Sequence, residues 1–364
     1  MASDDVWERL SARLVELGAD ERSLEAAQSE GLTGLRRLVA RYVAFPGERA
    51  YAPKDFYERF GVDEETAQAL WRAMGFPLVP ADEVAFTDAD LDAIVEATKL
   101  FEQGGLEKAV VLQQARAMGQ AAARIAASHL EVISEVVPEG DLARAAEQAL
   151  RIADESLPAL DRLLVYMYRR HLAAATEQRM LTEPGHEGGV AMSVGFADLT
   201  GFTALSQQLD ARELAGLIDR FNAATSDVVS QGGGRIIKTI GDEVMFATPD
   251  VASGAAISLA LAGETTRDLP PLKIGLASGA VIQREGDLFG SPVNLASRLV
   301  ATAKPHTALV DETTRNALVD DERFVFTSIG RRHLKGFGLV RSYRLRTAVP
   351  HEPPPPHRRR RRRT

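Results

Sequence analysis

The sequence predicts an all-α N-terminal domain followed by a domain of the α+β class. Residues 1–157 carry apolar side chains at a spacing near 3.6 residues, which places them on one face of each helix. From residue 190 to 348, short apolar runs alternate with helical stretches, which is typical of a sheet with helices packed on it. Residues 158–189 are predicted to be a connecting helix and linker, and residues 349–364 a disordered tail rich in proline and arginine.

Four helices of the N-terminal half have clear ends. Gly18 stops the first, Pro138 stops the second, and Pro158 is predicted to separate the last two, because proline lacks the N–H that continues a helix. The predicted ranges are Trp7–Leu17, Leu106–Val136, Asp141–Ser156 and Leu160–Met180.

Residues 53–72 read as a helix-turn-helix with Gly61 in the turn, so a DNA-binding regulator is an alternative function. The second helix of this unit opens with Asp63, Glu64 and Glu65. Three carboxylates at the end that should meet phosphates and bases disfavour DNA binding. We therefore interpret the unit as a packing motif.

The strands of the second domain predict a β-α-β-β-α-β core with extra strands at its C-terminal end. The predicted strands are 190–197, 234–240, 244–248, 272–279, 307–311, 324–329 and 342–346.

Composition limits the chemistry and the location. The chain has 364 residues, enough for each domain to bury a core, and no cysteine, which excludes disulfides and thiolate chemistry and fits the cytoplasm. No apolar run approaches about 18 residues, so no membrane-spanning helix is expected. The acidic first residues lack the apolar core of a signal peptide.

Net charge is distributed unevenly. The formal charge is −8, and Arg358 to Arg363 contribute +6, so the remainder carries −14 and is poorly suited to nucleic acid. Pro353 to Pro356 predict a stiff spacer before these arginines. The tail could contact an anionic membrane or RNA, or remain a solvated segment without a partner.

Two carboxylates stand where apolar strands end. Asp198 closes the first strand, and Asp242 follows Gly241 at the tip of the 234–248 hairpin. Each alone is more often a turn residue, but this topology can place them side by side. With no basic neighbour in sequence, a divalent cation such as Mg²⁺ is the expected neutraliser, and two such ions about 4 Å apart form a clamp for phosphoryl transfer.

Lys238 lies four residues before Asp242, and strand alternation predicts that it shares a face with Ile236 and Ile240. The alternative is an ordinary surface lysine whose head group reaches solvent.

A helix is predicted to begin with Ser291 as N-cap and Pro292 at the first position. Asn294 and Arg298 then share one face near its N-terminus, which suits phosphate or ribose. Asp287 precedes this helix in a predicted loop. The alternatives are a routine polar helix face and a loop aspartate.

Together these pieces resemble the class III nucleotidyl cyclase family over residues 190–348. The motif F-x-D-x-x-G-F-T matches Phe196 to Thr203. The resemblance implies a ferredoxin-like core and two Mg²⁺ or Mn²⁺ per active site, held by Asp198, Asp242 and the carbonyl of Leu199. It implies Asn294 and Arg298 as catalytic residues, and substrate contacts from Lys238, Asp287, Lys335, Phe202 and Thr203, with Lys335 in the motif Leu-Lys-Gly.

The resemblance also implies a substrate and an assembly. A lysine donor and an aspartate acceptor complement adenine, whereas guanylyl relatives use glutamate and usually cysteine at these places, so Lys238 and Asp287 favour ATP. The expected products are 3′,5′-cyclic AMP and pyrophosphate. Since one chain carries both residue sets of a site that the family builds between two chains, a homodimer is implied. The short segment 280–286 resembles that of actinobacterial members and leaves less dimer contact.

The helical half resembles, more loosely, the autoinhibitory regulatory domain of soluble mycobacterial-type cyclases, which implies control by pH or by a lipid. Histidine is the side chain suited to sensing pH near neutrality, so His171 and His186 are candidate sensors, although each alone reads more simply as a surface histidine. Two other readings stay open. Ile240 to Phe246 superficially resembles the diguanylate cyclase signature, and the domain could be an inactive cyclase homologue used as a dimerising signalling module.

Overall fold

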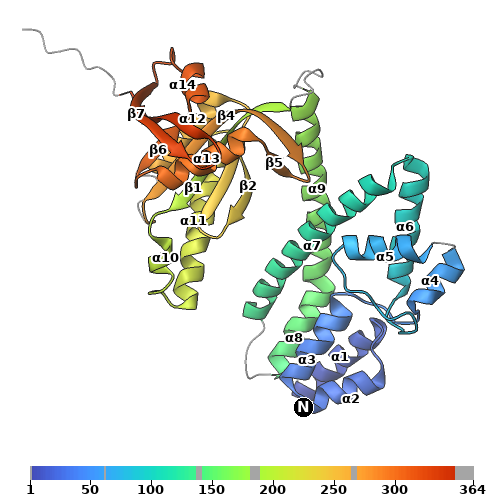
Figure 1. The fold of residues 1–364 in the computed structure, drawn as a ribbon. Coiled ribbons are helices and arrows are strands. Elements are labelled where there is room, and N and C mark those ends of the chain that lie inside the picture. The colour runs from blue at the N-terminus through green and yellow to red at the C-terminus, as the bar shows by residue number, and fades with distance from the viewer. Residues whose placement is uncertain (1, 61–62, 137–141, 181–188, 264–268, 349–364) are drawn as a thin grey trace, which may run out of the picture. The chain divides into compact units, whose positions relative to one another are not determined.

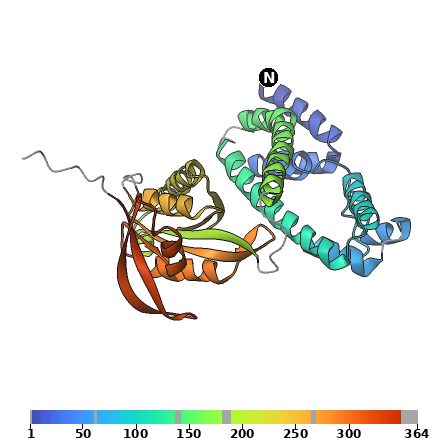
Figure 2. The same cartoon turned by 90° about the horizontal axis from the view of Figure 1, so that it is seen from above.

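The computed structural model describes residues 2–60, 63–136, 142–180, 189–263 and 269–348. The chain divides into two compact units between Leu181 and Thr182, and each is described by itself. Figures 1 and 2 show helices in the first unit and a helix-covered sheet in the second. The predicted fold classes of both halves are therefore confirmed. No helix in these ranges combines the length and apolarity needed to cross a membrane.

The core of the first unit forms where the helices at its start meet α8. Leu10, Leu14 and Leu35 are almost fully buried against Ala145 and Ala149, and small residues on α8 allow this close approach. The helices of this unit are α1 (Ala2–Glu16), α2 (Glu21–Ser29), α3 (Leu32–Leu38), the π-helix η1 (Val39–Val43), α4 (Pro53–Phe60), α5 (Glu64–Ala73), α6 (Asp88–Gly104), α7 (Lys108–Val136), α8 (Leu142–Arg151), the π-helix η2 (Ile152–Ser156) and α9 (Leu157–Met180).

The predicted break at Pro158 is instead a π-helical turn. η2 joins α8 directly to α9, and the N–H of Leu157 bonds the carbonyl of Ile152 five residues earlier. This wider turn precedes a proline that could not donate the next bond, so the helix passes Pro158 without ending. Arg13 of α1 holds the turn by donating from Nε to Asp154 at 2.8 Å.

α4 and α5 form the predicted helix pair, and Gly61 lies outside the described residues. Asp63 caps α5 by accepting from the N–H of Thr66 at 2.9 Å. Asp63, Glu64 and Glu65 are all exposed at this helix start, so the charge argument against a recognition helix holds in the structure. Beside the pair lies an apolar pocket, lined in part by Tyr57, Trp71, Leu78, Phe86 and Ile94.

The second unit contains the predicted β-α-β-β-α-β core. Its sheet has the strand order β2-β3-β1-β4-β6-β8-β7, with β5 paired to the outer part of β4. β4 and β6 are parallel, and the other paired strands are antiparallel. The strands are β1 (Val190–Leu199), β2 (Arg235–Ile240), β3 (Glu243–Thr248), β4 (Leu272–Arg284), β5 (Asp287–Phe289), β6 (Thr307–Val310), β7 (Phe324–Leu334) and β8 (Gly338–Thr347).

Two buried clusters lie on the two faces of this sheet. Phe221 of α11 and Ile257 of α12 pack with Phe246 on one face, while Leu299 of α13 packs with Met245 on the other. Alternation along β3 sends Met245 and Phe246 to opposite faces, as a sheet covered on both sides requires. The helices are α10 (Phe202–Leu205), α11 (Ala211–Gln231), α12 (Val251–Ala262), α13 (Ser291–Thr302) and α14 (Glu312–Ala317).

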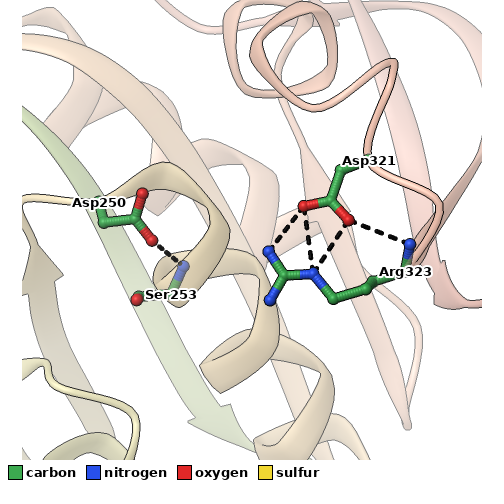
Figure 3. Close-up of polar contacts among 4 residues, drawn as sticks. All are labelled: Asp250, Ser253, Asp321 and Arg323. Atoms are coloured by element: carbon green, nitrogen blue, oxygen red, sulfur yellow. Dashed lines mark hydrogen bonds and ion pairs between the residues drawn. The ribbon is translucent and has the colours of Figure 1, made fainter.

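Local charges secure the elements that follow the hairpin (Figure 3). Asp250 caps α12 by accepting from the N–H of Ser253 at 2.7 Å, and this hydrogen bond lowers the pKa of Asp250. Asp321 holds Arg323 through the guanidinium and the backbone N–H just before β7. Both contacts lie close to their own strand or helix and do not enter the site.

The strand predicted to end at Gly279 continues to Arg284 and returns as β5, so Asp287 lies on a strand and not in the predicted loop. The reversal uses Glu285 and Gly286, with φ of 54° and 80°. Two successive residues with positive φ make the tight turn that matches strand twist. Ile282 pairs with Phe289 across this hairpin.

Candidate active site

Asp198 and Asp242 are neighbours in the structure, as the topology predicted. Asp198 lies at the end of β1, and Asp242 lies in the turn between β2 and β3, where Gly241 adopts a φ of 63°. The backbone N–H of Leu199 donates to the carbonyl of Asp242 at 3.1 Å. This bond links the end of β1 to the tip of the hairpin, so Asp198 and Asp242 lie at the same end of the neighbouring strands.

No basic residue adjoins these carboxylates in the sequence, but strand pairing brings one to them in the structure. Lys273 of β4 pairs with Asp198 across the sheet, and its Nζ lies 3.0 Å from Oδ1. On the other side of β1, Glu243 of β3 pairs with the same residue. The sequence signal was a single charged residue in the apolar run 272–279, but only the strand register shows that it faces Asp198.

Burial and mutual repulsion raise the pKa values of two carboxylates at this site. Burial raises the pKa of Asp198, the Lys273 ammonium opposes that rise, and the charge of Asp242 adds to it. Burial also raises the pKa of Glu243, with further increases from Asp198 and Asp242. Three carboxylates around one ammonium leave an excess of negative charge that favours a bound cation.

The donor set fits a divalent metal that is shared with a substrate. Among the described residues, no group of three or more His, Asp or Glu side chains could hold a metal ion alone. Mg²⁺ is usually held by one or two carboxylates together with water and substrate phosphates. Asp198, Asp242 and the main-chain carbonyl of Leu199 are donors of that kind.

Lys238 and Asp287 form an ion pair in which Lys238 Nζ donates to Asp287 Oδ2. The pair joins β2 to β5, and Asp287 Oδ1 also accepts from the N–H of Leu288 at 2.8 Å. Their side chains are 37% and 29% exposed, so both remain open to a ligand.

The face predicted for Lys238 was only partly right. The register of β2 shifts between Ile236 and Lys238, so Ile236 pairs with Phe246 and Lys238 pairs with Met245. An extra residue in one strand turns the following side chains to the other face. Lys238 therefore lies on the face opposite to Ile236, toward the side covered by α13.

Asn294 and Arg298 are exposed one turn apart on α13. The cap of this helix is Gly290, with a φ of 142°, and not Ser291, which is the first helical residue. Gly275 of β4 fixes the position of α13, because a Cβ there would lie 2.3 Å from the carbonyl oxygen of Ala296. The close packing at this glycine fixes α13 on the sheet, and with it the positions of the exposed Asn294 and Arg298.

The remaining predicted substrate residues are more widely spaced. Phe202 begins α10 just after β1 and packs partly buried against the cluster of α11 and α12, whereas Thr203 is exposed. Lys335 is exposed in the turn between β7 and β8. Within the described ranges, no hydrogen bond or ion pair links Thr203 or Lys335 to Asp198, Asp242, Lys238 or Asp287.

Comparison with known proteins identifies both halves of the chain. Residues 187–347 match the model of the adenylate and guanylate cyclase catalytic domain, and residues 5–173 match that of the adenylate cyclase regulatory domain. An adenylate cyclase of Glutamicibacter nicotianae is 33% identical over 363 residues, covering 94% of this chain and 89% of that protein.

Two further relatives show the same pattern. An adenylate cyclase of Streptomyces coelicolor is 39% identical, covering 75% of this chain and 72% of that protein. A pH-sensitive adenylate cyclase of Mycobacterium tuberculosis is 32% identical, covering 92% and 86%. The chain belongs to the class III adenylate and guanylate cyclase family, in the group that joins this catalytic domain to an adenylate cyclase regulatory domain.

Proposed function

We propose that the protein converts ATP to 3′,5′-cyclic AMP and pyrophosphate, under control of its helical domain. The observation that carries this proposal is the paired arrangement on one sheet. Asp198 and Asp242 meet at the end of β1, and Lys238 and Asp287 meet between β2 and β5. The first pair suits a metal–triphosphate complex, and the second complements adenine, which offers a ring-nitrogen acceptor and an exocyclic amine donor.

In the proposed reaction the ribose 3′-oxygen forms a bond to the α-phosphorus, and the bond from that phosphorus to the β-phosphate oxygen breaks. The 3′-hydroxyl loses its proton to water, and pyrophosphate leaves with the bonding electron pair. Two Mg²⁺ or Mn²⁺ ions, when bound, would lower the pKa of the hydroxyl and neutralise the phosphates. Asp198, Asp242 and the carbonyl of Leu199 would hold them.

The other residues of this chain position the substrate. Arg298 would stabilise negative charge that develops on the α-phosphate, and Asn294 would orient the ribose. Lys335 would bind the terminal phosphates as a charged donor. Phe202 and Thr203, at the start of α10 just after β1, would contact the substrate.

A homodimer would complete two equivalent sites. Each chain carries the metal carboxylates together with Lys238, Asp287, Asn294 and Arg298, and an interface related by a two-fold axis can use each set once. The β4–β5 hairpin is short and leaves its cross-strand pair Ile282 and Phe289 exposed at 60% and 50%. Such a small contact suggests that the helical unit contributes to dimerisation.

The helical unit would inhibit the catalytic domain in response to pH or a lipid. His171 is exposed on α9, the helix that precedes the linker, and His186 lies outside the described residues. The apolar pocket beside α4 and α5 offers a place for an acyl chain. The name of the pH-sensitive relative supports the first of these inputs. A wild-type rate that stays constant across about pH 5 to 8 would contradict pH control. A pH-dependent rate that is unchanged in His171→Gln would exclude His171 as the sensor.

The test of the catalytic proposal is production of cyclic AMP from ATP by the full chain with Mg²⁺ or Mn²⁺. Asp242→Asn should abolish it, because the variant keeps the size of the side chain and removes its charge. Asp219→Asn, an exposed residue on α11, is the matched control and should retain the wild-type rate. A wild type that turns over neither ATP nor GTP with either metal would favour the inactive, dimerising module.

A further inference from the structure

We propose that the helical unit binds a second copy of this chain through the exposed lengths of α7 and α9, with α7 of each copy packed against α9 of the other. This inference rests on the homodimer of the proposed function and names the surface that would form it in the helical unit. It is tested by assembly alone, so a protein that makes no cyclic AMP can still support or contradict it.

α7 and α9 are the longest helices of the first unit, with 29 and 24 residues, and large parts of both are open to solvent (Figure 1). Every residue from 122 to 128 on α7 and from 165 to 177 on α9 is exposed. The exposed side chains include Ile125, Val165 and Leu172. An isolated helix gains little stability by itself, and contiguous exposed apolar side chains mark an interaction surface. Both helices therefore present apolar surface that the described part of the chain leaves uncovered.

One face of α7 has the spacing of a seam along which two helices pack. Its residues recur at alternating steps of four and three: Val111, Ala115, Met118, Ala122, Ile125, His129 and Val132. Met118 and Ile125, near the middle of this seam, are 70% and 38% exposed. The charged residues Arg116, Arg124 and Glu131 lie outside the seam and outside the positions that flank it. α7 therefore offers an uncharged stripe to another helix.

α9 carries the same repeat with larger side chains. Its seam consists of Leu157, Leu160, Leu164, Met167, His171 and Ala174. Leu157 packs on the core of the helical unit, whereas Met167 and the adjacent Tyr168 are 40% and 67% exposed. On α7 the matching positions include the small residues Ala122 and Ala126. Large side chains on one helix fit against small ones on the other, so α7 suits α9 better than either helix suits itself.

A second copy supplies the partner that each open helix lacks. The two stretches stay exposed in one chain, so α7 and α9 of the same chain do not cover each other. A two-fold axis repeats each contact, and one interface therefore covers both seams of both chains. A stable interface uses about 20–30 residues from each partner, and residues 118–132 and 163–177 together are of that size.

The first experiment uses single cysteines in the full-length protein, which has no cysteine of its own. Ala122→Cys lies in the seam of α7, and Ala127→Cys, the matched control, lies on the other side of the same helix. Both positions are exposed in one chain. The thiol of Ala122→Cys should lose its reactivity toward a maleimide in proportion to the fraction of protein that sediments as a dimer. The thiol of Ala127→Cys should react at the same rate throughout.

The second experiment places a charge in the seam. Ile125→Glu should raise the dissociation constant of the full-length dimer, measured by sedimentation velocity, at least about 30-fold, which is typical of losing an anchor residue at the centre of an interface. Ala127→Glu is the matched control and should dimerise like the wild type. Since both positions are exposed in one chain, circular dichroism should show the same helix content for both variants.

Three results would overturn the proposal. The Ala122→Cys thiol could react as fast as the control in a protein that sediments as a dimer, which would leave the seam open. It could be protected at concentrations where the protein sediments as a monomer, which would show that the catalytic domain of the same chain covers it. Equal dissociation constants for Ile125→Glu and Ala127→Glu would place the dimer contact elsewhere. Protection that follows dimer formation in a protein without cyclase activity would contradict the proposed reaction alone.

Discussion

Lys238 on β2 donates a hydrogen bond to Asp287 on β5, 49 residues later in the chain. The contact holds a donor and an acceptor side by side on a partly exposed surface. If this pair reads the base, as proposed, ATP must separate two groups that already satisfy each other. Selectivity would then depend on how well the base replaces an existing ion pair.

Exchanging this pair should change the preferred base. Lys238→Glu combined with Asp287→Ser presents an acceptor and a neutral hydroxyl, which no longer complement adenine and can accept from the amine and ring N–H of guanine. We expect kcat/KM for ATP to fall at least about 100-fold, as for sites whose polar groups are left unpaired, and the ratio for GTP over ATP to rise. Steady-state rates with both nucleotides measure this. Equal losses for ATP and GTP would show that the pair supports the fold instead of reading the base.

Lys273 should act in the site, although it was not recognised in the sequence. The Lys273 ammonium lies 3.0 Å from the Asp198 carboxylate, and a metal bound by Asp198 would free it to contact the triphosphate. Lys273→Gln should lower kcat/KM for ATP about 10- to 100-fold, because a hydrogen bond to a charged group contributes about 1.5–3 kcal/mol. Lys273→Arg should keep most of the activity.

The same variant provides a second readout. Without nucleotide, Lys273→Gln should bind Mn²⁺ more tightly than the wild type, since the competing cation beside Asp198 is gone. Calorimetric titration of the full chain measures this affinity. Weaker Mn²⁺ binding in the variant would indicate that Lys273 holds Asp198 in place and does not compete with the metal.

Gly275 should be required for the position of α13. A Cβ would lie 2.3 Å from both the carbonyl oxygen of Ala296 and the N of Val300, and these backbone atoms cannot rotate away. Gly275→Ala should therefore shift the helix that carries Asn294 and Arg298, with a cost of about 1–3 kcal/mol in stability and a larger loss of kcat. Gly216→Ala on α11, where the nearest atom is a flexible arginine end at 3.4 Å, is the control. It should leave kcat unchanged and raise stability by up to about 1 kcal/mol, because alanine is favoured over glycine inside a helix. Denaturant unfolding and initial rates report the two effects.

The cap of α12 should make stability depend on pH in a predictable direction. The N–H of Ser253 lowers the pKa of Asp250, so the folded state favours the ionised carboxylate. This contribution is complete above the unfolded pKa near 3.9 and is lost as the pH falls below about 4. Asp250→Ala should cost about 1 kcal/mol at neutral pH and less in acid.

Asp250→Asn serves as the control for this cap. It keeps a capping oxygen and should retain most of the stability without the pH dependence. Denaturation midpoints at several pH values distinguish the variants. If the gap between wild type and Asp250→Ala stays constant into acid, the cap does not act through its charge.

The sequence by itself determined the fold class, the order of most elements and the candidate site residues that carry local motifs. Apolar periodicity distinguishes helices from strands because the two structures repeat at 3.6 and 2 residues. The motif around Asp198, the Gly-Asp turn at Asp242 and the Asn294–Arg298 spacing are all local signals. They could be read without knowing which strands pair.

Only the tertiary structure decided the contacts that depend on strand register. Lys273 meets Asp198, and Lys238 turns to the α13 face, because of pairings and a bulge that no local pattern encodes. The continuation of the helix past Pro158 likewise depends on packing, since Arg13 and the buried Ile152 hold the π-helical turn from outside it. Sequence periodicity specifies which face of an element is buried. The neighbours of that element are selected by the free energy of the whole packed domain. The charges around the active site therefore depend on the tertiary packing.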